Sequence, residues 1–181
     1  VEVNRPTHVF VQAGVGSLAG GVVGYFANLY PNNPPKFIVM EAGAADCLYK
    51  GAEAGDGEPR IVGGDLQTIM AGLACGEPNT IGWDILRNHV SAFISCPDWV
   101  SAKGMRMLAA PVKGDPSVTS GESGAVGMGV ISSIMTDDAY KKLREALELD
   151  NSSQVLMFST EGDTDPDKYK KIVWGGEYPT V

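Results

Sequence analysis

Histidine and cysteine are scarce in this sequence, which contains two and three of them among 181 residues. The cysteines, Cys47, Cys75 and Cys96, do not form the closely spaced pairs that are typical of a metal-binding motif. The histidines, His8 and His89, have no nucleophile or ligand partner at a recognisable spacing. We therefore predict free thiols and structural histidines. A disulfide between two of the cysteines stays open, and its pairing cannot be deduced from sequence.

Positive charge and long apolar runs are also in short supply. The 14 Lys and Arg residues are outnumbered by 22 Asp and Glu residues, which gives a net charge of −8. This balance argues against a nucleic-acid partner, because such a surface needs clustered basic residues. A solvated helix face explains the basic group of Lys168, Lys170 and Lys171. No apolar run is long enough to span a bilayer and no leader opens the chain, so we expect a cytoplasmic protein with no membrane partner.

Apolar runs and helical periodicity alternate along the chain, and hydrophobic residues make up 44% of it. Runs rich in β-branched and aromatic residues predict strands at 7–12, 37–40, 92–95 and 154–158. Periodicity and capping signals predict helices at 21–29, 44–50, 65–74, 82–89, 97–109, 125–135 and 137–147. The order strand, helix, strand at the start indicates a βαβ unit. We therefore predict one α/β unit with a parallel sheet over residues 1–181.

A glycine-rich turn follows the first predicted strand and contains Gly14, Gly16, Gly20 and Gly21. Glycines let the backbone turn sharply and direct several N–H groups inward, where the dipole of the following helix favours negative charge. The turn therefore predicts an anion site. It lacks the ending of a nucleoside-triphosphate loop and fits the dinucleotide pattern poorly. Glu41, at the end of the next strand, keeps a nucleotide-binding alternative open, and a turn without any ligand is a further alternative.

Two later loops, 120–125 and 159–163, are small and polar and lie where strands meet helices or irregular connections. Ligands collect at the carboxyl ends of strands in open parallel sheets. We therefore expect the glycine turn and these two loops to line one site. Each loop taken alone also fits a helix cap or a turn.

Together these loops resemble the fold type II, or tryptophan synthase β-like, family of pyridoxal-phosphate (PLP) enzymes. The resemblance implies a three-layer α/β fold with a parallel sheet, and PLP as cofactor. It assigns the cofactor phosphate to the backbone of the residues that match the family's glycine loop: Gly14, Val15, Gly16, Ser17 and Leu18. It assigns the hydroxyl partner of the pyridine nitrogen to Ser159 first and Thr160 second. Glu122 falls in a loop near the cofactor in the family, so a polar role there and helix capping are both open.

The segments 12–16, 69–78, 120–127 and 159–165 are similar to the diaminopropionate ammonia-lyase family. This similarity implies elimination of ammonia from the amino-acid substrate 2,3-diaminopropionate, giving pyruvate and two ammonia, by a homodimer. Threonine and serine dehydratase-like enzymes are an alternative with the same fold. A phosphate-binding module without chemistry is an alternative of another class.

The family's Schiff-base lysine precedes the glycine loop by a long stretch, and no lysine here matches its motif. The chain begins with Val1 rather than Met, so we expect it to be the carboxy-terminal part of the PLP-binding large domain. The amino-terminal half, the small domain and the catalytic residues would then be missing. We expect no catalytic residue in this chain and no activity from it alone. Glu41 and Asp46 match the place where some relatives hold a divalent cation, but the pattern is short and we predict no metal.

Overall fold

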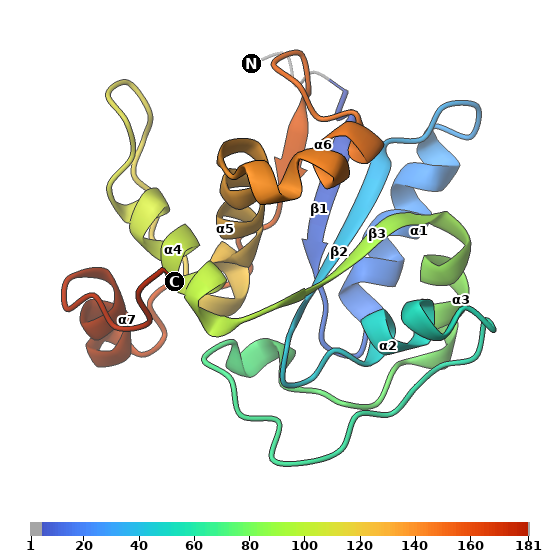
Figure 1. Cartoon of the computed structure of the whole chain (residues 1–181), viewed down its shortest axis with the longest axis horizontal. Helices are drawn as coiled ribbons and strands as arrows, with labels where there is room; N and C mark the ends of the chain where they lie inside the picture. Colours follow the sequence, from blue (N-terminus) through green and yellow to red (C-terminus); the bar gives the residue numbers. More distant parts are fainter. Residues whose placement is uncertain (1–4, 181) are drawn as a thin grey trace.

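The computed structural model describes residues 5–180, which form a four-stranded parallel sheet with helices on both faces (Figure 1). The strand order is β3-β2-β1-β4, with all neighbours parallel. The strands are β1 (His8–Gln12), β2 (Lys36–Ala42), β3 (Val90–Cys96) and β4 (Val155–Met157). All four predicted strands are thus confirmed. Their carboxyl ends meet at one edge of the sheet, as the sequence analysis expected.

Helices form one layer on each side of the sheet (Figure 1). On one side lie α1 (Ser17–Leu29), α2 (Cys47–Ala54) and α3 (Thr80–His89). On the other lie α4 (Asp98–Ala109), α5 (Glu122–Thr136) and α6 (Lys141–Leu147). The helix α7 (Pro166–Val173) packs against α4. Two short 3-10 helices complete the elements, η1 (Ala71–Leu73) and η2 (Asp138–Tyr140).

The alternation of side chains along the central strands explains why both faces are covered. In β1, Val9 and Val11 pack into the cluster formed with α1, α2 and α3, whereas Phe10 packs into the cluster formed with α4 and α5. All three side chains are completely buried. A strand with apolar residues on both faces is stable only between two layers, which is the usual arrangement of parallel sheets.

The predicted helix at 65–74 is wrong. Most of the segment 55–79 has no regular structure and passes below the carboxyl ends of the strands, and η1 is its only helical part (Figure 1). Asp65 accepts a hydrogen bond from the Gln67 N–H at 3.2 Å and caps no helix. The Asp98 carboxylate instead accepts the Ile69 N–H at 3.2 Å. A contact with α4 therefore decides the backbone here, and the local pattern does not.

Other boundaries moved by smaller amounts. The helix predicted at 21–29 begins at Ser17, and the one predicted at 137–147 divides into η2 and α6. All three cysteines are free thiols. His8 is a structural residue: its Nε2 lies 2.8 Å from the Leu147 carbonyl oxygen, and its Nδ1 lies 2.8 Å from Thr7 Oγ1. Within residues 5–180 no helix has the length and apolar character that crossing a membrane requires.

Candidate functional site

A cavity of about 340 Å³ opens at the carboxyl ends of β1 and β4. The glycine loop after β1 forms one wall of it, with Gly14, Val15, Ser17 and Leu18. The irregular segment before α3 forms a second wall, with Gly72, Leu73 and Cys75. The third wall is made by Gln12, Ser123, Thr160 and Glu161. The three loops that the sequence analysis expected at one site therefore do meet.

The glycine loop presents a run of unpaired backbone donors. The Ala13 N–H still bonds the Met40 carbonyl oxygen of the neighbouring strand, at 2.8 Å. Among the described residues, the N–H groups of residues 14–19 then have no acceptor, and bonding resumes with the Gly20 N–H on the Gly16 oxygen at 2.8 Å. The carbonyl oxygen of Val15 is held by the Asn79 N–H at 2.7 Å. Backbone N–H groups without an acceptor, next to a carbonyl oxygen that is already hydrogen-bonded, form an arrangement that binds an anion.

The start of α1 adds to this preference for negative charge. Gly16, its N-cap residue, has φ 91°, and the first turn contains no acidic side chain and no side-chain cap. The positive end of the helix dipole is therefore left for an external anion. A Cβ at Gly16 would lie 3.2 Å from Leu48 Cδ1 and from Leu86 Cδ1, so the loop also needs glycine for packing.

On the opposite wall, Gln12 fixes the residue after Ser159. Gln12 Nε2 donates to the Phe158 carbonyl oxygen at 2.8 Å and to Thr160 Oγ1 at 2.9 Å. Thr160 lines the cavity, whereas the Ser159 hydroxyl donates to Ser120 Oγ at 2.9 Å and is not among the lining residues. Of the two candidate hydroxyl residues, the structure thus brings Thr160 to the cavity and leaves Ser159 outside its lining.

The lining residues Ser123 and Glu161 were not among the candidates from sequence. The Glu161 carboxylate accepts the Ser123 N–H at 2.5 Å, near the start of α5, and the Glu161 carbonyl oxygen accepts the Gly121 N–H at 3.0 Å. Both residues belong to loops that the sequence analysis had singled out. Their pairing depends on two segments far apart in the chain, so no local signal could have marked them.

Glu122 and Gly16 do not line the cavity. Glu122 is only 9% exposed, and its Oε1 lies 3.2 Å from Lys168 Nζ on α7. Lys168 also donates to the Ile69 carbonyl oxygen at 3.2 Å. The interpretation of Lys168 as part of a solvated helix face is therefore wrong, because its ammonium group is half-buried in an ion pair. Lys170 is exposed, as that interpretation expected.

Glu41, the residue that kept a nucleotide or cation site open, is completely buried. Its Oε1 accepts the Leu48 N–H at 2.9 Å and its Oε2 accepts the Tyr49 N–H at 2.6 Å. Burial raises the pKa of the Glu41 carboxyl group to about 7. Within residues 5–180 no group of three metal-ligating side chains is present. Both carboxylate oxygens of Glu41 thus serve the start of α2.

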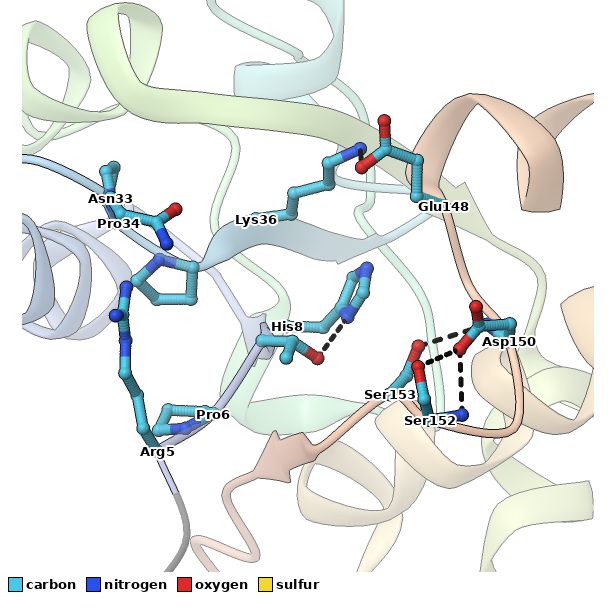
Figure 2. A pocket seen from close by; sticks show the side chains of 12 residues that line it. Arg5, Pro6, His8, Asn33, Pro34, Lys36, Glu148, Asp150, Ser152 and Ser153 are labelled. Carbon is cyan, nitrogen blue, oxygen red and sulfur yellow. Dashed lines mark hydrogen bonds and ion pairs between the residues drawn. The ribbon is translucent and has the colours of Figure 1, made fainter.

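A second cavity, of about 440 Å³, lies at the opposite, amino-terminal ends of β1 and β2 (Figure 2). Three of its charged side chains, those of Lys36, Glu148 and Asp150, already have partners. Lys36 Nζ pairs with the Glu148 carboxylate at 2.9 Å, and the Asp150 carboxylate accepts the Ser152 N–H at 2.8 Å and its hydroxyl at 2.6 Å. The first cavity, with its free donors, is therefore the better candidate despite its smaller volume.

Comparison with known proteins gives a consistent result. The sequence model of the family described as "Pyridoxal-phosphate dependent enzyme" matches residues 1–161. Diaminopropionate ammonia-lyase from Salmonella typhimurium is 54% identical over 172 residues, which are 94% of this chain and 43% of that protein. The same enzyme from Escherichia coli K12 is 50% identical over 173 residues, which are 96% of this chain and 43% of that protein.

A solved structure gives the same picture for the fold. The Escherichia coli diaminopropionate ammonia-lyase, crystallised with an aminoacrylate-PLP azomethine reaction intermediate, superposes with a TM-score of 0.87 at 48% identity. The match covers 97% of this chain and 44% of that one. The fold is therefore that of the fold type II PLP enzymes. The chain spans less than half the length of the relatives it matches.

Proposed function

Because the chain belongs to the family of pyridoxal-phosphate-dependent enzymes, we propose that it is the carboxy-terminal part of an ammonia-lyase acting on 2,3-diaminopropionate. The complete protein eliminates ammonia from this substrate and releases pyruvate and a second ammonia. Identities of 54% and 50% to enzymes with that name support the choice of substrate. The observation that carries the proposal is the cavity whose glycine loop holds unpaired N–H groups.

The backbone of residues 14–19 binds the cofactor phosphate in this proposal. The free N–H groups donate to phosphate oxygens, and the open amino end of α1 adds a favourable dipole. Gly14 fits closely against the second wall, since a Cβ there would lie 3.3 Å from the Gly72 carbonyl oxygen. The residues present therefore fit a phosphorylated cofactor.

Thr160 is the proposed hydroxyl partner of the pyridine nitrogen, and Ser159, which donates to Ser120 Oγ, is not a lining residue. The Thr160 oxygen already accepts a hydrogen bond from Gln12, so its own O–H is available to donate into the cavity. A hydroxyl group donates a hydrogen bond to the ring nitrogen and keeps its proton, whereas a carboxylic acid could transfer its proton to that nitrogen. When bound, PLP supplies an electron-withdrawing ring that stabilises negative charge at the substrate Cα.

Glu161 and Ser123 shape the wall beside that ring. The Glu161 carboxylate caps the start of α5 through the Ser123 N–H, so the loop that carries Thr160 is tied to a helix. Glu122 acts indirectly in this proposal, because its ion pair with Lys168 connects the start of α5 to α7. The cavity wall is thus fixed from two sides before any ligand arrives.

The lysine that the chemistry needs lies outside this chain in our proposal. The lining residues of the cavity include no lysine. Lys168, on the far side of the α5 start, is held by Glu122 and by a backbone oxygen. We therefore propose that residues 1–181 form one α/β unit of the PLP-binding large domain, inactive without the rest of the protein.

We also propose that the complete protein is a cytoplasmic homodimer. The free state of Cys47, Cys75 and Cys96 supports a reducing compartment. The dimer follows from the family resemblance, and light scattering of the complete protein tests it. A monomer would contradict that part of the proposal.

The test of the proposed function is pyruvate release from 2,3-diaminopropionate by the complete protein with added PLP. We expect rapid release of pyruvate from diaminopropionate. Release of pyruvate from serine and of 2-oxobutyrate from threonine should be weak. Residues 1–181 alone should release none. Rapid turnover of serine or threonine without turnover of diaminopropionate would contradict the substrate. Binding of inorganic phosphate but not PLP by the complete protein would favour a binding module without chemistry.

A further inference from the structure

Glu41 is a buried carboxyl group outside the cavity. Contacts through the start of α2 connect it to the glycine loop. Its two oxygens accept the N–H groups of Leu48 and Tyr49, the second and third residues of α2. A helix leaves these N–H groups without a partner of its own. Within the described residues Glu41 has no ion pair with a basic side chain. A residue of β2 thus caps α2.

The first turn of α2 lies directly behind the glycine loop. Leu48 Cδ1 is 3.2 Å from the position that a Cβ at Gly16 would occupy, so Leu48 packs against the bend of the loop. Cys47 Sγ lies 3.9 Å from the Gly14 carbonyl oxygen and 3.6 Å from the Cys75 carbonyl oxygen. Gly14 and Cys75 both line the cavity. A shift of this turn would therefore displace two of the cavity walls.

We propose that Glu41 is a positioning residue for the anion site: by holding the first turn of α2, it fixes the backbone of residues 14–19 in the conformation that binds phosphate. The identity of the anion as the cofactor phosphate rests on the proposed function. Glu41 touches no ligand and acts through Leu48 and Cys47. Its charge alone would repel a bound phosphate, so geometry and charge predict opposite effects of removing it.

Glu41→Gln in the complete protein separates the two effects, because glutamine keeps the shape but has one acceptor and one donor. One of the two N–H groups would then face an NH₂ group instead of an oxygen. At pH 8 we expect the dissociation constant for PLP, measured by titrating the apo-protein, to rise roughly threefold to tenfold. Amide hydrogen exchange should become faster at residues 14–19 and at Leu48 and Tyr49.

The melting temperature of the apo-protein provides the readout that distinguishes positioning from plain stabilisation. Neutral glutamine removes a charge whose burial is unfavourable, so the melting temperature should stay constant or rise while the affinity for PLP falls. Glu53→Gln is the matched control, since Glu53 is an exposed carboxylate on the same helix, paired with Lys50 at 2.9 Å. It should change neither the affinity nor exchange at residues 14–19.

An unchanged or lower dissociation constant in Glu41→Gln would overturn the proposal, since charge would then outweigh geometry. Weaker binding together with a lower melting temperature would overturn it as well, because general loss of stability would explain both. Amide hydrogen exchange at Leu48 and Tyr49 is measured on the apo-protein, so this readout does not depend on the binding of PLP. If the complete protein binds no PLP, the proposed function fails, and the same comparison with inorganic phosphate as the probe still decides the role of Glu41.

Discussion

The side-chain amide of Gln12 donates a 2.9 Å hydrogen bond to the hydroxyl oxygen of Thr160, 148 residues further along the chain. Gln12 is the last residue of β1 and is almost completely buried, so it offers a fixed donor. The bond orients the Thr160 hydroxyl and leaves its proton free to donate. A contact with the end of the sheet therefore holds the Thr160 hydroxyl oxygen in place.

Replacing Thr160 tests this arrangement. Thr160→Val keeps the shape but removes the hydroxyl, and leaves a buried donor of Gln12 with one acceptor fewer. In the complete protein we expect kcat/KM for diaminopropionate to fall about tenfold, the size of one lost hydrogen bond. Thr160→Ser retains the hydroxyl and should stay within about threefold of the wild type. Equal losses in the two variants would mean that the methyl group, and not the hydroxyl, matters.

The left-handed backbone of Gly16 predicts a second effect, on stability. Gly16→Ala combines a strained φ of 91° with 3.2 Å contacts to Leu48 and Leu86. We expect urea denaturation of the complete protein to show a loss of about 1–3 kcal/mol in the free energy of unfolding. Gly21→Ala, in the open middle of α1, should instead be neutral or stabilising by up to about 1 kcal/mol. Similar losses at both positions would refute the packing argument.

The ion pair of Glu122 and Lys168 leads to a third prediction, which concerns the free energy of unfolding. Lys168→Met leaves the nearly buried Glu122 carboxylate without its cation, and we expect a loss of about 1–3 kcal/mol in the free energy of unfolding. Adding Glu122→Gln to that variant should recover part of the loss. Lys171→Met, at an exposed position of α7, should cost less than about 0.5 kcal/mol. Additive effects in the double variant would show that the two side chains do not interact.

The pH dependence of stability gives a fourth prediction. Burial, with a smaller effect of the nearby Asp46 carboxylate, raises the pKa of Glu41 from 4.5 to about 7. A raised pKa means that the native state holds a proton which the unfolded chain has released. The stabilisation is therefore complete below pH 4.5 and is lost as the pH rises through about 7.

The expected loss over that range is up to about 3 kcal/mol, measured as the free energy of unfolding in urea between pH 5 and pH 8. Glu41→Gln should remove most of this slope. Burial also raises the pKa values of the Cys47 and Cys96 thiols, to about 12, so these neighbours do not titrate in the same range. A wild-type slope that persists unchanged in the variant would assign it to other groups.

The fold was largely predictable because its signals are local. The run before Gly14 is apolar on both faces, and glycines follow at the point where the chain must turn, so β1 and the anion loop could be located from sequence. The sequence predicts the start of α1 four residues too late, because Gly20 and Gly21 have weak helix propensity. Packing decides there instead: a Cβ at Gly20 would lie only 3.0 Å from Gly82 Cα of α3.

The parts that could not be predicted depend on distant partners. The segment 65–74 carries a helical pattern, but the carboxylate of Asp98 in α4 accepts the Ile69 N–H. Glu161 enters the cavity wall because Ser123, near the start of α5, donates to it. The sequence around Lys168 predicts a surface residue, but in the structure its ammonium group pairs with Glu122. In each case the decisive contact is tertiary, and a local pattern carries no record of it.

The unpaired N–H groups of residues 14–19 belong to the main chain, so the recognition they provide is almost independent of the side chains that accompany them. Replacing Val15, Ser17 or Leu18 by alanine would leave the donors in place. Alanine substitutions at these three positions would therefore leave the anion-binding groups unaltered. A proline at one of these positions would instead remove a donor and weaken the anion site.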